Sequence, residues 1–149
     1  MFTQNYIKMC EKAEEIQNDH KYERFDIIYN HSKTKDFKIS ISLDEYYRSA
    51  IEYIEREDIG ENVYMVNGYV SVWAKNIIIW LPTQEQLQEM SGLSWWKFDL
   101  MCSNIRQVLS EDPLSEIEIE TKEEAGMCCI LMEKWNKIWN GEKWIKEVN

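Results

Sequence analysis

The sequence predicts a single α+β domain in which an antiparallel β-meander carries helices on one face. Three observations predict this fold. Residues Phe37 to Ser42 alternate apolar and polar side chains, as in an antiparallel strand with one solvated face. Asn67-Gly68 separates two apolar runs and favours a type I′ hairpin turn. Thr83 has capping-box spacing directly after the apolar run Ile77 to Leu81, so a strand there passes into a helix.

The remaining strands follow from short apolar runs bounded by turn residues. We expect the meander to consist of Phe25 to Tyr29, Phe37 to Ser42, Val63 to Val66 and Tyr69 to Leu81. Ser115 to Glu120 alternates Ile with Glu, which predicts a further short strand with a charged outer face that discourages unwanted pairing.

Helices are predicted where apolar residues recur at helical spacing next to a capping residue. The expected helices run from Thr3 to about Gln17, between Ser42 and Gly60, from Thr83 to Gly92, from Ser94 to Asp112-Pro113, and from Thr121 to about Trp139, where Asn140-Gly141 ends the last one. In the helix that begins at Ser94, the inner face is predicted to carry Phe98, Met101, Cys102, Ile105, Val108 and Leu109.

The charge of the chain limits its partners. With 17 basic and 27 acidic residues, the formal net charge is -10, which disfavours direct binding to nucleic acid or to an anionic membrane. Seven carboxylates lie between Glu111 and Glu124, against Lys122 alone. We therefore expect an acidic surface that binds a protein partner with a basic surface, formed by Glu111, Asp112, Glu116, Glu118 and Glu120.

A second candidate site is aromatic. Six of the seven tryptophans lie in the second half of the chain, where such rings form either core or a binding surface. Amide side chains next to an indole suit a planar ligand or a peptide backbone. The residues of this candidate pocket are Trp80, Gln84, Gln88, Trp139 and Trp144.

The sequence carries no signature of catalysis, of a metal or of a cofactor. The four cysteines and two histidines lack metal-ligand spacing. Glu120-Thr121-Lys122, with Asp112 upstream, is loosely similar to the active site of PD-(D/E)xK nucleases, but Thr121 and Lys122 are better explained as the start of a helix. We predict no catalytic residue, no metal and no cofactor. The cysteines are expected to be reduced core thiols, and without a signal peptide or a membrane-spanning run we expect the cytoplasm of a bacterial host cell.

Three stretches carry a resemblance to a known family. They are Met9-Cys10-Glu11-Lys12-Ala13-Glu14-Glu15-Ile16-Gln17, Ile79-Trp80-Leu81-Pro82-Thr83-Gln84-Glu85-Gln86-Leu87-Gln88-Glu89-Met90 and Lys134-Trp135-Asn136-Lys137-Ile138-Trp139-Asn140-Gly141-Glu142-Lys143-Trp144. In sequence and order they resemble a family of small uncharacterised proteins from phages and prophages of low-GC Gram-positive bacteria. Family members pass quickly from the first stretch to the second, whereas Tyr22 to Lys75 is extra here. The resemblance implies a phage-encoded accessory protein of the host cytoplasm and implies no activity.

Three classes of function remain open. The first is a non-enzymatic protein that binds a host or phage protein, in its most specific form an acidic inhibitor of a host defence nuclease. The second is a protein that binds or sequesters a small molecule in the aromatic pocket. The third is an enzyme of unrecognised type.

Overall fold

The computed structural model describes residues 2–23, 25–30, 53–55, 58, 60–66, 78–111 and 117–147. Their helices and antiparallel sheets confirm the predicted α+β class. Contacts divide the chain into two compact units, each described by itself below. Unit 1 holds Met1–Phe2 and Glu15–Leu81, and unit 2 holds Thr3–Glu14 and Pro82–Asn149. That all 149 residues form one domain stays a prediction.

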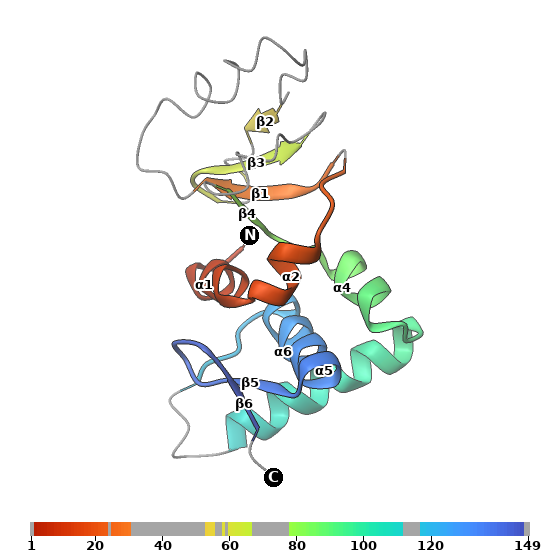
Figure 1. Cartoon of the computed structure of the whole chain (residues 1–149). Helices are drawn as coiled ribbons and strands as arrows, with labels where there is room; N and C mark the ends of the chain where they lie inside the picture. Colours follow the sequence, from red (N-terminus) through yellow and green to blue (C-terminus); the bar gives the residue numbers. More distant parts are fainter. Residues whose placement is uncertain are drawn as a thin grey trace. The chain divides into compact units, whose positions relative to one another are not determined.

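Unit 1 contains a four-stranded antiparallel sheet with the strand order β2-β3-β1-β4 (Figure 1). The strands are β1 Ile27–Asn30, β2 Tyr53–Glu55, β3 Val63–Val66 and β4 Ile78–Trp80. Ile28 of β1 lies opposite Tyr64 on β3 and Trp80 on β4 and is fully buried, as expected in a central strand. Strands β1, β3 and β4 fall at or within about two residues of the predicted strands.

Strand β2 corrects the end of the helix predicted between Ser42 and Gly60, whereas residues 42–52 of that prediction lie outside the described residues. Tyr53–Glu55 pairs with β3 as a strand, because aromatic and β-branched residues favour a sheet once a partner strand is available. The order also departs from a sequential meander, since β1 lies between β3 and β4. Three other predictions fall outside the described residues, namely the strand Phe37 to Ser42, the Asn67-Gly68 hairpin and the segment Tyr69 to Trp73.

Unit 2 is built around helix α6. Its elements are α1 Gln4–Lys12, α4 Gln84–Ser91, α5 Trp95–Glu111, α6 Lys122–Trp135 and the hairpin strands β5 Lys137–Trp139 and β6 Trp144–Lys146. Helix α6 packs against α1, α4, α5 and β5 (Figure 1), and every residue from Glu124 to Leu131 is buried. A Cβ on Gly126 would lie 3.0 Å from the side chains of Leu87 and Phe98, so glycine lets α4 and α5 approach α6 closely.

The predicted passage from a strand into a helix at Thr83 is confirmed. The N–H of Gln86 donates to the hydroxyl of Thr83, and the side-chain oxygen of Gln86 accepts the N–H of Thr83. Leu87 is buried behind this capping box, and Gly92 ends α4 with a left-handed φ of 69°.

Two predicted helices are shorter than expected. The helix from Thr3 breaks at Ala13, where ψ is 70°, and a separate helix α2, Glu14–Asp19, follows. Tyr6 and Met9 of α1 are buried and belong to unit 2, whereas Ile16 of α2 is buried and belongs to unit 1. The last helix ends at Trp135 rather than near Trp139. There Asn136 adopts the left-handed conformation that asparagine tolerates, and β5 pairs with β6 around Asn140-Gly141.

Two further predictions fail in unit 2. Residues 117–120 of the predicted strand Ser115 to Glu120 form no strand, and Ser115 and Glu116 lie outside the described residues. The backbone carbonyls of Glu118 and Glu120 accept hydrogen bonds from the side chains of Asn5 and Arg106. The inner face of α5 is buried only in its first half. There Phe98 and Cys102 are 2% and 3% exposed, whereas Val108 is 66% exposed.

Candidate functional site

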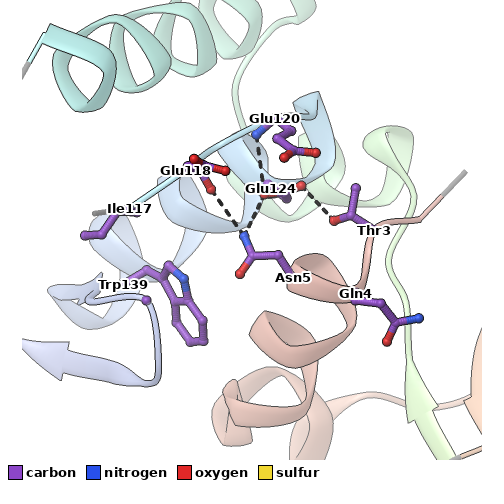
Figure 2. A pocket seen from close by; sticks show the side chains of 9 residues that line it. Thr3, Gln4, Asn5, Ile117, Glu118, Glu120, Glu124 and Trp139 are labelled. Atoms are coloured by element: carbon purple, nitrogen blue, oxygen red, sulfur yellow. Dashed lines mark hydrogen bonds between the residues drawn. The ribbon is translucent and has the colours of Figure 1, made fainter. Parts of the chain in front are cut away.

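Unit 2 contains a pocket of about 400 Å³ lined by several polar side chains, which we call the acidic pocket (Figure 2). Its walls come from the start of α1, the segment 117–120, the start of α6 and the β5–β6 hairpin. It is lined by Thr3, Gln4, Asn5, Ile117, Glu118, Glu120, Glu124, Trp139 and Gly141. Three of these residues carry carboxylates, and none carries a basic side chain.

Glu124 is the buried acid of the pocket and has no exposed surface. It is the third residue of α6, where the unpaired N–H groups at the helix start favour a negative charge. One carboxylate oxygen accepts hydrogen bonds from the hydroxyls of Thr3 at 2.7 Å and Thr121 at 3.3 Å. The other accepts from the amide of Asn5 at 2.7 Å and the N–H of Glu120 at 3.5 Å. Among the described residues no basic side chain pairs with it, so neutral donors alone satisfy this carboxylate.

Thr3 and Asn5 hold the pocket together because each has two roles. The hydroxyl of Thr3 caps α1 by accepting the N–H of Tyr6 at 3.0 Å, and it donates to Glu124. The amide of Asn5 donates to Glu124 and, at 3.3 Å, to the backbone carbonyl of Glu118. Figure 2 shows these bonds joining α1 to α6 and to the segment 117–120.

The carboxylates of Glu118 and Glu120 are available to a ligand. Both side chains are exposed, and neither carboxylate has a hydrogen-bond or ion-pair partner among the described residues. The nearby guanidinium of Arg106 donates to the backbone carbonyl of Glu120 at 3.1 Å rather than to its side chain.

The indole of Trp139 forms an apolar wall of the pocket (Figure 2). It is 4% exposed and packs against Trp144 with ring centroids 5.1 Å apart. Trp144 is held in turn by its ring N–H, which donates to the carbonyl of Met9 at 2.9 Å. Next to the pocket the ammonium of Lys8 bonds to Glu142 at 2.6 Å, and this bond lowers the pKa of that exposed carboxyl.

This arrangement suits an organic cation. Carboxylates attract an ammonium or guanidinium group, and an indole stabilises the same group and its aliphatic stem. Among the described residues, no group of three or more His, Cys, Asp or Glu side chains is arranged to hold a metal ion.

The structure brings together parts of both predicted sites. Glu118 and Glu120 from the acidic surface share the acidic pocket with Trp139 from the aromatic set. Glu111 is exposed at the end of α5 and accepts a hydrogen bond from Gln107 at 3.0 Å. Asp112 and Glu116 lie outside the described residues.

The other aromatic candidates have structural partners. Trp80 belongs to unit 1, and Trp144 packs behind Trp139. Gln84 donates to Glu123 at 3.1 Å, and Gln88 donates to the carbonyl of Leu93. Of the five residues, only Trp139 lines the two described pockets, and the aromatic site stays a prediction.

Sequence reasoning missed Thr3, Asn5 and Glu124 as pocket residues. Thr121 and Glu124 have capping-box spacing, and Thr121 does cap α6 by accepting the N–H of Glu124 at 3.2 Å. However, the side chain of Glu124 turns to Thr3 and Asn5, more than a hundred residues away in the chain. No local pattern signals such a contact.

A second cluster, in unit 1, was also missed. His20 stacks on Trp80 with ring centroids 3.3 Å apart, and its Nε2 lies 2.7 Å from the buried carboxylate of Asp26. The ring N–H of Trp80 is buried and has no hydrogen-bond partner among the described residues. Neither described pocket is lined by His20, Asp26 or Trp80, so we assign this cluster to the packing of unit 1.

Comparisons of the chain with protein families, with curated proteins and with solved structures find no match. In the part of the chain that the structure describes, no helix has the length and apolarity needed to cross a membrane. The acidic pocket is therefore the feature of the chain that bears most directly on its function.

Proposed function

We propose that the chain is a non-enzymatic binding protein whose acidic pocket receives a lysine or arginine side chain from the basic surface of a protein partner. The observation that carries the proposal is the pair of exposed carboxylates of Glu118 and Glu120, which have no partner among the described residues and line one pocket with the buried Glu124 and Trp139. Two carboxylates and an indole around one cavity match a cationic side chain in both charge and shape.

The charge of the whole chain supports a protein partner over nucleic acid. A net charge of -10 repels a phosphate backbone and speeds the approach of a basic surface. The resemblance adds the biological setting of the proposal, a phage or prophage accessory protein in the host cytoplasm. The four free, buried cysteines support a reducing compartment. The most specific form of this proposal is an inhibitor of a host defence nuclease, because the nucleic-acid channel of such an enzyme is basic.

Affinity capture with three matched baits tests the proposal. The baits are the unmodified chain, the pocket variant Glu118→Gln/Glu120→Gln and the control variant Glu85→Gln/Glu89→Gln. The control changes two exposed carboxylates on α4, so both variants lose two negative charges from the same net charge. We expect a protein with a basic surface to be recovered from host lysate by the unmodified and control baits and to be reduced about tenfold with the pocket variant. Equal recovery with both variants would contradict the proposal, as would recovery of no protein at all.

A further inference from the structure

An apolar groove of about 360 Å³ lies between α5, α6 and β5 in unit 2. Its apolar lining includes Ile105, Val108 and Leu109 from α5, Met132 from α6 and Ile138 from β5. Val108 and Ile138 are 66% and 38% exposed. Val108 lies on the predicted inner face of α5, and the described residues leave it uncovered.

The groove adjoins the acidic pocket. Ile117 and Trp139 line both cavities, so the acidic pocket and the groove are neighbours that share these two side chains. A single segment of a ligand can therefore fill the acidic pocket and the groove at once.

Charge and polarity together define what fits this double cavity. The acidic pocket demands a cation, whereas the groove offers almost only apolar atoms and gains from burying them. A small amine would leave the groove empty, and a purely apolar peptide would leave the two exposed carboxylates of Glu118 and Glu120 without a counter-charge.

We propose that the groove binds apolar side chains of the same partner, which presents a short amphipathic segment with Leu, Ile, Met or Phe next to Lys or Arg. This inference rests on the proposed function and narrows it to a class of recognition motif. The groove supplies the burial of apolar anchors, and the acidic pocket fixes their orientation through one basic residue.

Three labelled peptides of about four helical turns each test the proposal against the full chain. In the first, Leu recurs at helical spacing and Lys fills the other positions; the second replaces each Leu by Ser, and the third replaces each Lys by Glu. Fluorescence anisotropy gives the dissociation constants. We expect the Lys/Leu peptide to bind about tenfold tighter than the Lys/Ser peptide, the fold-change expected for burying one leucine, and the Glu/Leu peptide to bind weakest.

A matched pair of variants locates the effect. Val108→Gln/Ile138→Gln changes two exposed residues of the groove, and Leu100→Gln/Ile145→Gln changes two residues outside its lining that are 54% and 37% exposed. The groove variant should bind the Lys/Leu and Lys/Ser peptides equally, whereas the control should keep the tenfold difference.

Each other outcome overturns a specific claim. If the Lys/Leu and Lys/Ser peptides bind the unmodified chain equally, the groove inference is wrong and the proposed function stands. If the Glu/Leu peptide binds as tightly as the Lys/Leu peptide, or if neither basic peptide binds, both the groove inference and the proposed function are wrong. If the groove variant unfolds in much less denaturant than its control, or changes a dimer into a monomer in sedimentation, the groove is covered by this chain or by a second copy, and the inference is overturned.

Discussion

Glu124 shows how a single buried carboxylate can position a site. Its two oxygens accept hydrogen bonds from Thr3, Asn5, Thr121 and the backbone of Glu120. Such a network is stable only while every donor meets an acceptor, because an unpaired polar group in the interior costs free energy. The same bonds hold α1 and the segment 117–120 on α6, so Glu124 fixes the shape of the acidic pocket.

The substitution Glu124→Gln tests this role. The new amide turns an NH₂ group toward hydroxyl and amide donors, so we expect the free energy of unfolding to fall by about 1–3 kcal/mol. The adjacent Glu123→Gln is the control, because Glu123 is half-buried at the same helix start and bonds only to Gln84 among the described residues. Denaturant unfolding measures both. Similar losses in the two variants would show that the helix terminus, and not the buried network, is what Glu124 stabilises.

At the scale of elements, capping residues were predicted well because they act over one helical turn. Thr83 and Gly92 begin and end α4 as the sequence indicates, and Thr121 begins α6. The failures lie where a distant partner decides the structure. Tyr53–Glu55 is a strand that pairs with β3, and the residues after Asn136 form the β5–β6 hairpin in place of a longer α6.

The sequence after α6 contains the pattern of a hairpin as well as the spacing of a helix. Asn140-Gly141 lies between two short runs with alternating lysine, isoleucine and tryptophan, which is the pattern that predicted a hairpin at Asn67-Gly68. In the structure the side chain of Asn140 accepts the N–H groups of Glu142 and Lys143 at 2.9 and 2.8 Å. The helical spacing of Trp135, Ile138 and Trp139 concealed this turn.

The cap of α4 gives a prediction at this scale. Thr83→Ala removes the hydroxyl that accepts the N–H of Gln86, and we expect a loss of about 1 kcal/mol in the free energy of unfolding. Thr83→Ser keeps the hydroxyl and should cost much less. An unchanged denaturation midpoint for Thr83→Ala would show that this residue does not stabilise α4.

At the scale of the whole molecule, all of unit 1 except Met1–Phe2 is an insertion in the sequence of unit 2. Glu15–Leu81 leaves unit 2 after α1 and returns before α4. This span contains the segment that the resemblance treats as extra, Tyr22 to Lys75. The acidic pocket and the groove both lie in unit 2, so the candidate site needs no residue of the insertion.

A shortened chain tests whether unit 2 folds alone. The hydroxyl of Tyr6 donates to the carbonyl of Pro82 at 2.6 Å. Helix α1 continues from Tyr6 to Lys12 by roughly 9 Å of helical rise, and Glu14 follows two residues later. A Gly/Ser linker of about eight residues, which spans up to about 26 Å, can therefore join Glu14 to Pro82. We expect this chain to unfold cooperatively and to keep a helical circular dichroism spectrum. A non-cooperative transition would show that unit 2 depends on unit 1.

The site could be predicted only in part, because its residues come from distant segments. Composition and charge indicated Glu118, Glu120 and Trp139 separately, but only the fold places an acidic loop beside an indole from the final hairpin. The groove could not be predicted. Helical periodicity places Val108 on the inner face of α5, but it does not show that the described residues leave this side chain exposed.

The salt dependence of peptide association tests the central claim most directly. The association rate of the Lys/Leu peptide is measured by stopped flow from about 0.05 to 0.5 M NaCl for the unmodified chain, Glu118→Gln/Glu120→Gln and Glu85→Gln/Glu89→Gln. If the acidic pocket is the docking point, the rate falls steeply with salt for the unmodified chain and the control, and the slope is shallower for the pocket variant. Equal slopes for the two variants would mean that the overall charge of -10 attracts the peptide and that the acidic pocket does not bind it.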